Sequence, residues 1–248
     1  MANWNDPQPP QTGLGASPRL NGEAISQAGT YDQGLRKHML AIYNYMASGV
    51  LLSGIVAMLF ASSGFALQVM MTPLKWVIML APLGFVMAMS MGANRMKTIT
   101  LQALFWGFCV VMGLSLSTIF LVFTGASIAT TFFATAGAFA GLSLVGYTTK
   151  RDLSAMGAFM AMGVIGILIA MVVNIFMQSS GLSMAISMLG VLIFAGLTAW
   201  DTQRLKQEYH MLAGTEFAGK AVILGALSLY LDFINMFQFL LSFLGNRN

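Results

Sequence analysis

Charged residues leave four long stretches of the chain uninterrupted, and this pattern predicts membrane-spanning helices. No Asp, Glu, Lys or Arg occurs in residues 38–74, 76–94, 98–149 or 153–200. About 20 apolar residues in a helix cross a bilayer core, so the length of each stretch indicates how many spans it holds. The last two stretches are long enough for two spans each, and short polar turns divide them at Thr124–Ser127 and Gln178–Gly181.

Seven predicted spans account for residues 36–248. They are placed at 39–62, 76–94, 99–123, 128–148, 154–177, 182–203 and 219–244. We therefore expect an all-α polytopic membrane protein with seven transmembrane helices.

The basic residues predict the orientation of these helices, because Lys and Arg are retained on the cytoplasmic side. With the N-terminus inside, ten of the twelve basic residues fall in inner segments, and the outer segments hold only Lys75 and Arg247. We expect a cytoplasmic N-terminus and an external C-terminus, in a bacterial inner (plasma) membrane. The net charge of +4 then reflects topology and contact with anionic lipid, and no nucleic-acid partner is expected.

The composition excludes an ordinary soluble enzyme, because 57% of residues are hydrophobic, 8% are charged and the mean hydropathy is +0.77. Residues 1–35 carry four of the six prolines and few apolar residues, which predicts a disordered cytoplasmic tail. The single cysteine, Cys109, lies within the third span and forms no disulfide within the chain. No nucleotide-binding or His-Glu-x-x-His pattern is present, so we expect neither a cofactor nor an enzyme.

Two carboxylates interrupt the apolar sequence and are the main candidates for a functional site. Asp201 lies near the cytoplasmic end of the sixth span, and Asp232 lies well inside the seventh, with 11 uncharged residues before it and 14 after. An isolated carboxylate at that depth would cost several kcal/mol. We therefore expect Asp232 to be protonated, paired or in contact with water.

Asp232 belongs to a polar stripe along the last helix. At about 100° per residue, the stripe falls within an arc of about 120°. Its members are Ser228, Asp232, Asn235, Gln238 and Ser242. The stripe predicts that this helix packs centrally and turns its polar face toward other helices or a water-filled path. The alternative is a polar seam that only holds the helices together.

Two segments of the last helices resemble the signatures of the Bax-inhibitor family, also called transmembrane Bax inhibitor motif proteins, in its bacterial form. They are Leu197-Thr198-Ala199-Trp200-Asp201-Thr202-Gln203 and Gly225-Ala226-Leu227-Ser228-Leu229-Tyr230-Leu231-Asp232-Phe233-Ile234-Asn235-Met236-Phe237. The resemblance is close over about 195–245, while the first five helices match in hydrophobic layout.

The resemblance implies a final helix surrounded by the other six and a pair of aspartates that share a proton and control a calcium leak in response to pH. By motif the pair maps to Asp201 and Asp232, and an arginine that bonds to it maps to Arg95. Trp200 stands where relatives often carry Tyr, which removes a hydroxyl beside the first aspartate.

The chemistry of the residues is consistent with this implication. Two carboxylates held close cannot both ionise cheaply, so the pair titrates as a unit. Calcium takes about six to eight oxygen ligands, and two aspartates supply at most four. Asn235, backbone carbonyls or water would supply the rest, which favours transient passage over tight storage. Ser228, Asn235 and Gln238 are the pore-lining candidates.

Helix lengths raise a difficulty for this pairing. If the sixth helix runs to His210 and the seventh begins at Glu216, Asp201 lies about 13 Å from the turn and Asp232 about 24 Å from it. A flush hairpin would separate the pair by about 10 Å along the axis. Either the seventh helix projects further, or it is broken near Gly225, or the pair is looser.

Three classes of function follow. The first is a pH-sensitive calcium leak channel or transporter, whose partners are the lipid bilayer, calcium and protons. The second is a regulatory protein acting on a membrane-protein partner in the control of cell death or membrane proteases, through the tail or residues 204–220. The third, an intramembrane aspartyl protease, lacks its usual Tyr-Asp and Gly-x-Gly-Asp contexts around Trp200-Asp201 and Leu231-Asp232. We expect the first.

Overall fold

The computed structural model describes the backbone of residues 22–247 and the side chains of residues 33–247. Two compact units are distinguished, Met1–Arg36 and Lys37–Asn248. Residues 1–35 were expected to form a disordered tail, and residues 1–21 of it lie outside the described residues. From Gly22 onward its backbone is helical, so the first helix begins well before the predicted span at residue 39.

Eight helices make up the described chain, and seven of them are long and apolar enough to cross a membrane. Their bounds are α1 Gly22–Ser62, α2 Phe65–Met70, α3 Leu74–Gly92, α4 Thr98–Val122, α5 Gly125–Thr148, α6 Ser154–Met177, α7 Ser180–Leu212 and α8 Ala218–Leu244. The prediction of an all-α protein with seven transmembrane helices is therefore confirmed. The short helix α2 was not predicted and lies in the segment that joins the first two spans.

The two predicted polar turns divide the long apolar stretches where expected. Thr124 caps the start of α5, its side chain accepting a hydrogen bond from the Ser127 N–H at 3.3 Å. Ser179 caps α7 in the same way, accepting from the Leu182 N–H at 3.3 Å. Side-chain oxygens at these positions satisfy backbone N–H groups that a helix start leaves without partners. Each cap therefore begins a new helix without exposing backbone donors to lipid.

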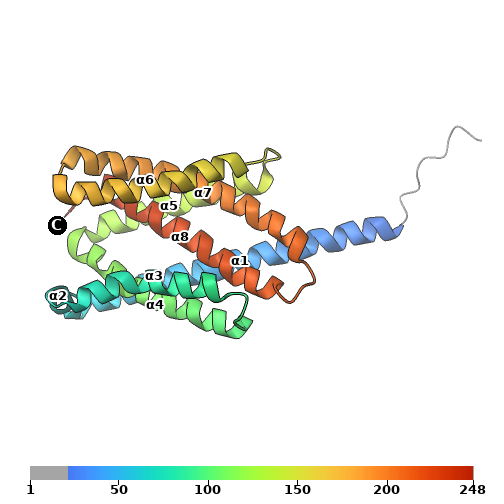
Figure 1. Ribbon diagram of the computed structural model, residues 1–248, viewed down its shortest axis with the longest axis horizontal. Coiled ribbons are helices and arrows are strands. Elements are labelled where there is room, and N and C mark those ends of the chain that lie inside the picture. The colour runs from blue at the N-terminus through green and yellow to red at the C-terminus, as the bar shows by residue number, and fades with distance from the viewer. Residues whose placement is uncertain (1–21, 248) are drawn as a thin grey trace, which may run out of the picture. The chain divides into compact units, whose positions relative to one another are not determined.

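The C-terminal helix α8 is the central element of the second unit, as predicted. In its most hydrophobic window 61% of residues are buried, against 6% in α6 and 11% in α3. It crosses the unit between the group of α5, α6 and α7 and the pair of α3 and α4, and it contacts α4, α5 and α7 (Figure 1). Most of its circumference is therefore covered by protein, whereas α6 and α3 present their apolar side chains to lipid.

A buried polar contact ties α8 to α1 and α4. The Tyr230 hydroxyl lies 2.7 Å from Ser53 Oγ of α1, and Ser53 also donates to the Cys109 carbonyl of α4 at 2.7 Å. Tyr230 is fully buried between the rings of Phe105 and Phe108, with centroids 6.4 and 5.1 Å away. Hydroxyl groups satisfied inside apolar surroundings resist sliding between helices, so this contact fixes the position of α8 along its axis.

The helices α7 and α8 form an antiparallel pair in one continuous register. Gly190 packs against the ring of Phe239, and Ser187 Oγ donates to Ser242 Oγ at 3.0 Å. At the other end, the absence of a side chain on Gly225 makes room for Leu205. Positions that are later on α7 contact positions that are correspondingly earlier on α8, so the register between the two helices is constant. A constant register is expected for close-packed helices without a break.

This pair also resolves the length difficulty raised by the sequence. Helix α7 continues to Leu212 and α8 begins only at Ala218, so Asp201 lies 11 residues before one end and Asp232 lies 14 residues after the other. At about 1.5 Å per residue the two depths are about 17 and 21 Å, a difference smaller than one helical turn. The helix α8 is continuous through Gly225, so a break there is not needed.

Glycine substitutions in α5 test the close packing of α5 on α7. A Cβ at Gly146 would collide with the backbone carbonyl of Ala199, whereas a Cβ at Gly141 would meet no atom within 4 Å. We expect Gly146→Ala to destabilise the protein by about 1–3 kcal/mol, because a backbone atom must move. Gly141→Ala, in the same helix, is the matched control and should leave the Tm in detergent unchanged or raise it. Equal Tm values for the two variants would contradict this packing.

Candidate functional site

The structure brings Asp201 of α7 and Asp232 of α8 together in the interior of the second unit. Asp201 is 4% exposed and Asp232 is 5% exposed. Their carboxyl groups lie close enough for their charges to interact. The sequence segments that resemble the family signatures therefore meet face to face, each contributing one carboxyl group.

Two carboxyl groups can share a hydrogen bond only when one of them carries a proton, because an ionised carboxylate only accepts. Asp232 belongs to no ion pair among the described residues, and its Oδ2 receives no hydrogen bond from a described N–H or O–H group. Two negative charges in contact inside a membrane protein, with a cation on one side only, would be strongly unfavourable. Burial of the two carboxyl groups side by side therefore favours one proton on the pair over two negative charges.

The cation beside the pair is Arg204, one turn after Asp201 on the same helix. Arg204 Nη2 lies 3.0 Å from Asp201 Oδ1 in an ion pair, and it donates to Ser228 Oγ of α8 at 3.1 Å. Ser228 Oγ in turn donates to Asp201 Oδ2 at 2.5 Å. Arg204, Ser228 and Asp201 thus form a closed ring of polar contacts across α7 and α8.

Two further side chains hold the Arg204 guanidinium in place. Arg204 Nε lies 3.5 Å from Glu208 Oε1, one turn further along α7. The ring of Trp200 lies 4.8 Å from the guanidinium carbon, within the range of a cation–π interaction. Trp200 itself packs against Gly157 of α6, where no side chain intervenes. Trp200 therefore contacts the arginine through its ring and offers no hydroxyl to the carboxyl pair.

Arg95, the arginine expected beside the pair, is placed elsewhere. It is exposed in the turn that follows α3, and neither of the ion pairs found in residues 33–247 includes it. The signal that could have found Arg204 is its spacing of three residues from Asp201, which brings the two side chains onto one face of a helix. That spacing was not used, because the arginine beside the pair was assigned to Arg95 by resemblance, and Arg204 was counted only as a basic residue after the sixth span.

Two cavities lie on either side of the carboxyl pair along α8. The first, the Arg204 cavity, has a volume of about 520 Å³ and lies between α3, α7 and α8. Its polar lining comes from Ser90, Arg204, Glu208 and Ser228. The second, the Asn235 cavity, has a volume of about 620 Å³ and lies between α6, α7 and α8. Ser228 and Asn235 are the polar positions one turn before and one turn after Asp232.

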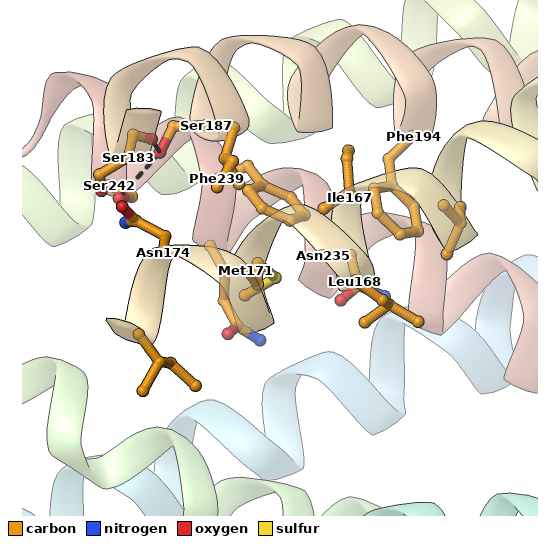
Figure 2. Close-up of a pocket in the computed structure, with 14 residues that line it drawn as sticks. Ile167, Leu168, Met171, Asn174, Ser183, Ser187, Phe194, Asn235, Phe239 and Ser242 are labelled. Carbon is orange, nitrogen blue, oxygen red and sulfur yellow. Dashed lines mark hydrogen bonds between the residues drawn. The ribbon is translucent and has the colours of Figure 1, made fainter. Parts of the chain in front are cut away.

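The Asn235 cavity accounts for the rest of the predicted polar stripe. Asn235, Gln238 and Ser242 of α8 line it together with Ser183 and Ser187 of α7. Figure 2 shows Ser183, Ser187 and Ser242 together at one end of the cavity, beside Asn174 of α6, with Asn235 further along and Phe194 and Phe239 in its apolar lining. The stripe is therefore not a seam closed by hydrogen bonds along its whole length, because part of it faces a space large enough for water.

The described residues contain no group of three or more His, Cys, Asp or Glu side chains that could hold a metal ion. Asp201 and Asp232 supply carboxyl oxygens, and Asn235 supplies an amide oxygen one turn away. A cation with six or more oxygen ligands would therefore take most of them from backbone carbonyls or water at this site.

These features define a polytopic α-helical membrane protein with a buried carboxyl pair between two partly polar cavities. Comparison with known families identifies it further: residues 35–248 match the family described as inhibitor of apoptosis-promoting Bax1, and the chain belongs to this Bax inhibitor family. The membership predicted from two short segments is therefore confirmed across nearly the whole chain.

Relatives at high identity occur in distant bacteria. An uncharacterized protein of Rickettsia prowazekii is 48% identical over 219 residues, covering 88% of this chain and 93% of the relative. An uncharacterized protein of Caulobacter vibrioides is 47% identical over 228 residues, covering 87% and 91%. The inner membrane protein YbhL of Escherichia coli is 42% identical over 218 residues, covering 86% and 93%. The chain is thus similar to these bacterial proteins over almost their full length, and one of them is named as an inner membrane protein.

Removing the Arg204 charge tests whether this arginine, and not Arg95, neutralises the pair. Arg204→Gln leaves the Asp201 carboxylate buried without a cation, and we expect a loss of about 2 kcal/mol in stability. Arg95→Gln, which removes the same charge from an exposed turn, should change stability by less than about 0.5 kcal/mol. The measurement is thermal unfolding of the purified protein in detergent.

A second substitution separates the electrostatic effect from lost packing. Adding Asp201→Asn to Arg204→Gln removes the uncompensated charge, so the double variant should be more stable than Arg204→Gln alone. A double variant that loses the sum of the two single effects would show that Arg204 does not act on Asp201.

Proposed function

We propose that this protein conducts calcium ions across the membrane and that the Asp201–Asp232 pair controls the flux in response to pH. The observation that carries the proposal is the position of the pair: two buried carboxyl groups, one from each of two adjacent helices, between the Arg204 cavity and the Asn235 cavity. An ionisable group inside a membrane domain is a default candidate for an ion or proton pathway. Family membership and the inner-membrane relative YbhL are consistent with such a role.

The chemistry of the path suits a hard cation in transit. Carboxylate, amide and hydroxyl oxygens follow one another along α8 at Ser228, Asp232 and Asn235, and calcium prefers oxygen ligands. Because these residues supply few oxygen ligands at any one depth in the membrane, water would complete the coordination of the calcium ion. A weakly coordinated ion leaves as readily as it enters, which conduction requires.

In this proposal Arg204 acts as a latch between α7 and α8. Its ion pair with Asp201 and its hydrogen bond with Ser228 join the two helices at the level of the pair. Uptake of a proton by the carboxyl pair reduces the negative charge that holds the guanidinium, so the latch weakens in acid. We therefore propose that calcium flux increases as pH falls.

The orientation proposed for the chain places the N-terminus in the cytoplasm. The turns that join α3 to α4, α5 to α6 and α7 to α8 then lie at the cytoplasmic face. Arg95, Lys97, Lys150 and Arg151 fall in the first two of these turns, in line with the retention of Lys and Arg on that side. The Arg204 cavity would open toward the cytoplasm and the Asn235 cavity toward the outside.

Calcium flux into liposomes that contain a calcium dye tests the proposal. Wild-type protein should leak with a rate that increases from mildly alkaline to mildly acidic pH. Asp201→Asn removes the charge that holds Arg204, so this variant should leak at every pH, and Asp232→Asn should flatten the pH dependence because the shared proton loses one of its sites. Glu216→Gln, at an exposed carboxylate between α7 and α8, is the matched control and should behave as wild type.

Two outcomes would overturn this function. If wild type and both aspartate variants are equally tight or equally leaky, the pair is structural. If, in addition, a membrane protein co-purifies with the chain, the second class, a regulatory protein that acts through a partner, becomes the better description.

A separate substitution tests the pathway without changing the pair. Asn235→Leu replaces a polar group that lines the Asn235 cavity with an apolar one of similar size. We expect a lower calcium flux at every pH with the same dependence on pH, because the pair and Arg204 are unchanged. Asn94→Leu, in the exposed turn after α3, makes the same chemical change outside the pathway and should leave the flux as it is. Equal flux in wild type and Asn235→Leu would place the ion path elsewhere.

A further inference from the structure

A third cavity lies apart from the carboxyl pair, between the α5–α6 turn and the end of α7. Its volume is about 240 Å³, and Lys150, Arg151 and Lys206 line it together with His210. A space of this size is smaller than a typical pocket for a drug-sized ligand and suits a small group such as a phosphate. The cavity shares no lining residue with the Arg204 cavity or the Asn235 cavity.

The turn that forms this cavity is held in shape by Gln203. This side chain, which is 7% exposed, donates from Nε2 to the Arg151 carbonyl at 2.7 Å and accepts from the Leu153 N–H at 2.8 Å. The Thr149 hydroxyl accepts from the Arg151 N–H at 3.3 Å. The backbone between the two spans is therefore fixed to α7, and the basic side chains project from a defined frame.

The positive charge of the cavity is not balanced within the described chain. Neither of the two ion pairs found among residues 33–247 includes Lys150, Arg151 or Lys206. Asp152 is the one carboxylate in the lining, and its Oδ1 already accepts from the Ser154 N–H at 2.9 Å. Hydrogen bonds from the Ser154 hydroxyl and N–H lower the pKa of the Asp152 carboxyl, so Asp152 stays ionised and offsets one of the three positive charges of Lys150, Arg151 and Lys206. Positive charge therefore remains in excess in this cavity.

Lys206 adds an oriented donor at the inner side of the cavity. Its Nζ donates to the Tyr147 carbonyl at 2.9 Å and lies 4.9 Å from the centre of the Tyr147 ring. These contacts fix the ammonium group and use one of its three N–H donors, so two remain for a ligand. Tyr147 lies one residue before the end of α5, at the level where aromatic side chains meet lipid headgroups.

We infer that this cavity binds the phosphate of an anionic phospholipid headgroup, with Lys150, Arg151 and Lys206 as its ligands. A phosphate diester carries one negative charge and accepts several hydrogen bonds, which matches the unbalanced cations and free donors of the site. The cavity lies between the ends of two membrane spans, where a lipid headgroup is present at high local concentration and a soluble phosphate is not. The lipid is therefore the favoured source of the phosphate.

Binding of short-chain phosphatidylglycerol to the full chain in detergent tests this site. Wild type should bind dioctanoyl phosphatidylglycerol and not the zwitterionic dioctanoyl phosphatidylcholine. Each basic residue near a lipid surface contributes about fivefold in affinity, so Lys150→Ala with Arg151→Ala should weaken binding about 30-fold. Inorganic phosphate, titrated alone, should bind much more weakly than the lipid.

Two matched variants separate a defined site from general surface charge. Lys37→Ala with Lys97→Ala removes the same charge at exposed positions away from the cavity, and its affinity should equal that of wild type. Lys150→Arg with Arg151→Lys keeps the charge and should retain binding, because positive charge at these two positions carries the affinity. Equal weakening by the Lys37 and Lys97 substitutions, equal binding of the two lipids, or inorganic phosphate as strong as phosphatidylglycerol would each overturn the inference.

Discussion

The structure depends on burying a carboxyl pair at the contact of two helices inside a membrane domain. An isolated carboxylate at that depth is expensive, so the chain supplies a second carboxyl group, a serine hydroxyl and a guanidinium around it. Asp232 must be covered by protein, which forces α8 into the centre and leaves α3 and α6 to face lipid. The polar contact between Tyr230 and Ser53 then keeps α8 at the depth where Asp232 meets Asp201.

Small residues allow this arrangement, because they let the backbones approach closely enough for short polar side chains to meet. Gly190 accommodates the Phe239 ring and Gly225 accommodates Leu205, above and below the carboxyl pair. Ser228 reaches both Asp201 and Arg204 with a side chain of a single hydroxymethyl group, which is possible only at close helix separation. Packing and electrostatics are therefore coupled at this site, and a change in one alters the other.

Most of the fold could be predicted from the sequence, since membrane spans are defined by the absence of charge and two capped turns divide the long stretches. The two aspartates and the polar face of α8 could also be predicted, because a carboxylate within apolar sequence is easily recognised. Arg204 was missed because hydropathy places it just after the sixth span, among basic residues whose expected role is to set orientation, whereas in the structure it lies on α7 one turn after Asp201. Arg95 was chosen instead because of the resemblance to a known family. Which arginine lies beside the carboxyl pair depends on how the helices pack, and no local sequence pattern gives that packing.

The shallow attachment of α6 has a consequence for the Asn235 cavity. Its principal neighbour is α7. The two helices contact each other at Gly157 and Gly163 of α6 and at Gly196 of α7, while the outer surface of α6 is apolar and exposed. One wall of the cavity is therefore a helix whose position is opposed on its far side by acyl chains instead of protein. The lateral pressure and thickness of the surrounding bilayer thus act directly on the width of that space, without disturbing the contacts that hold α8 in the centre.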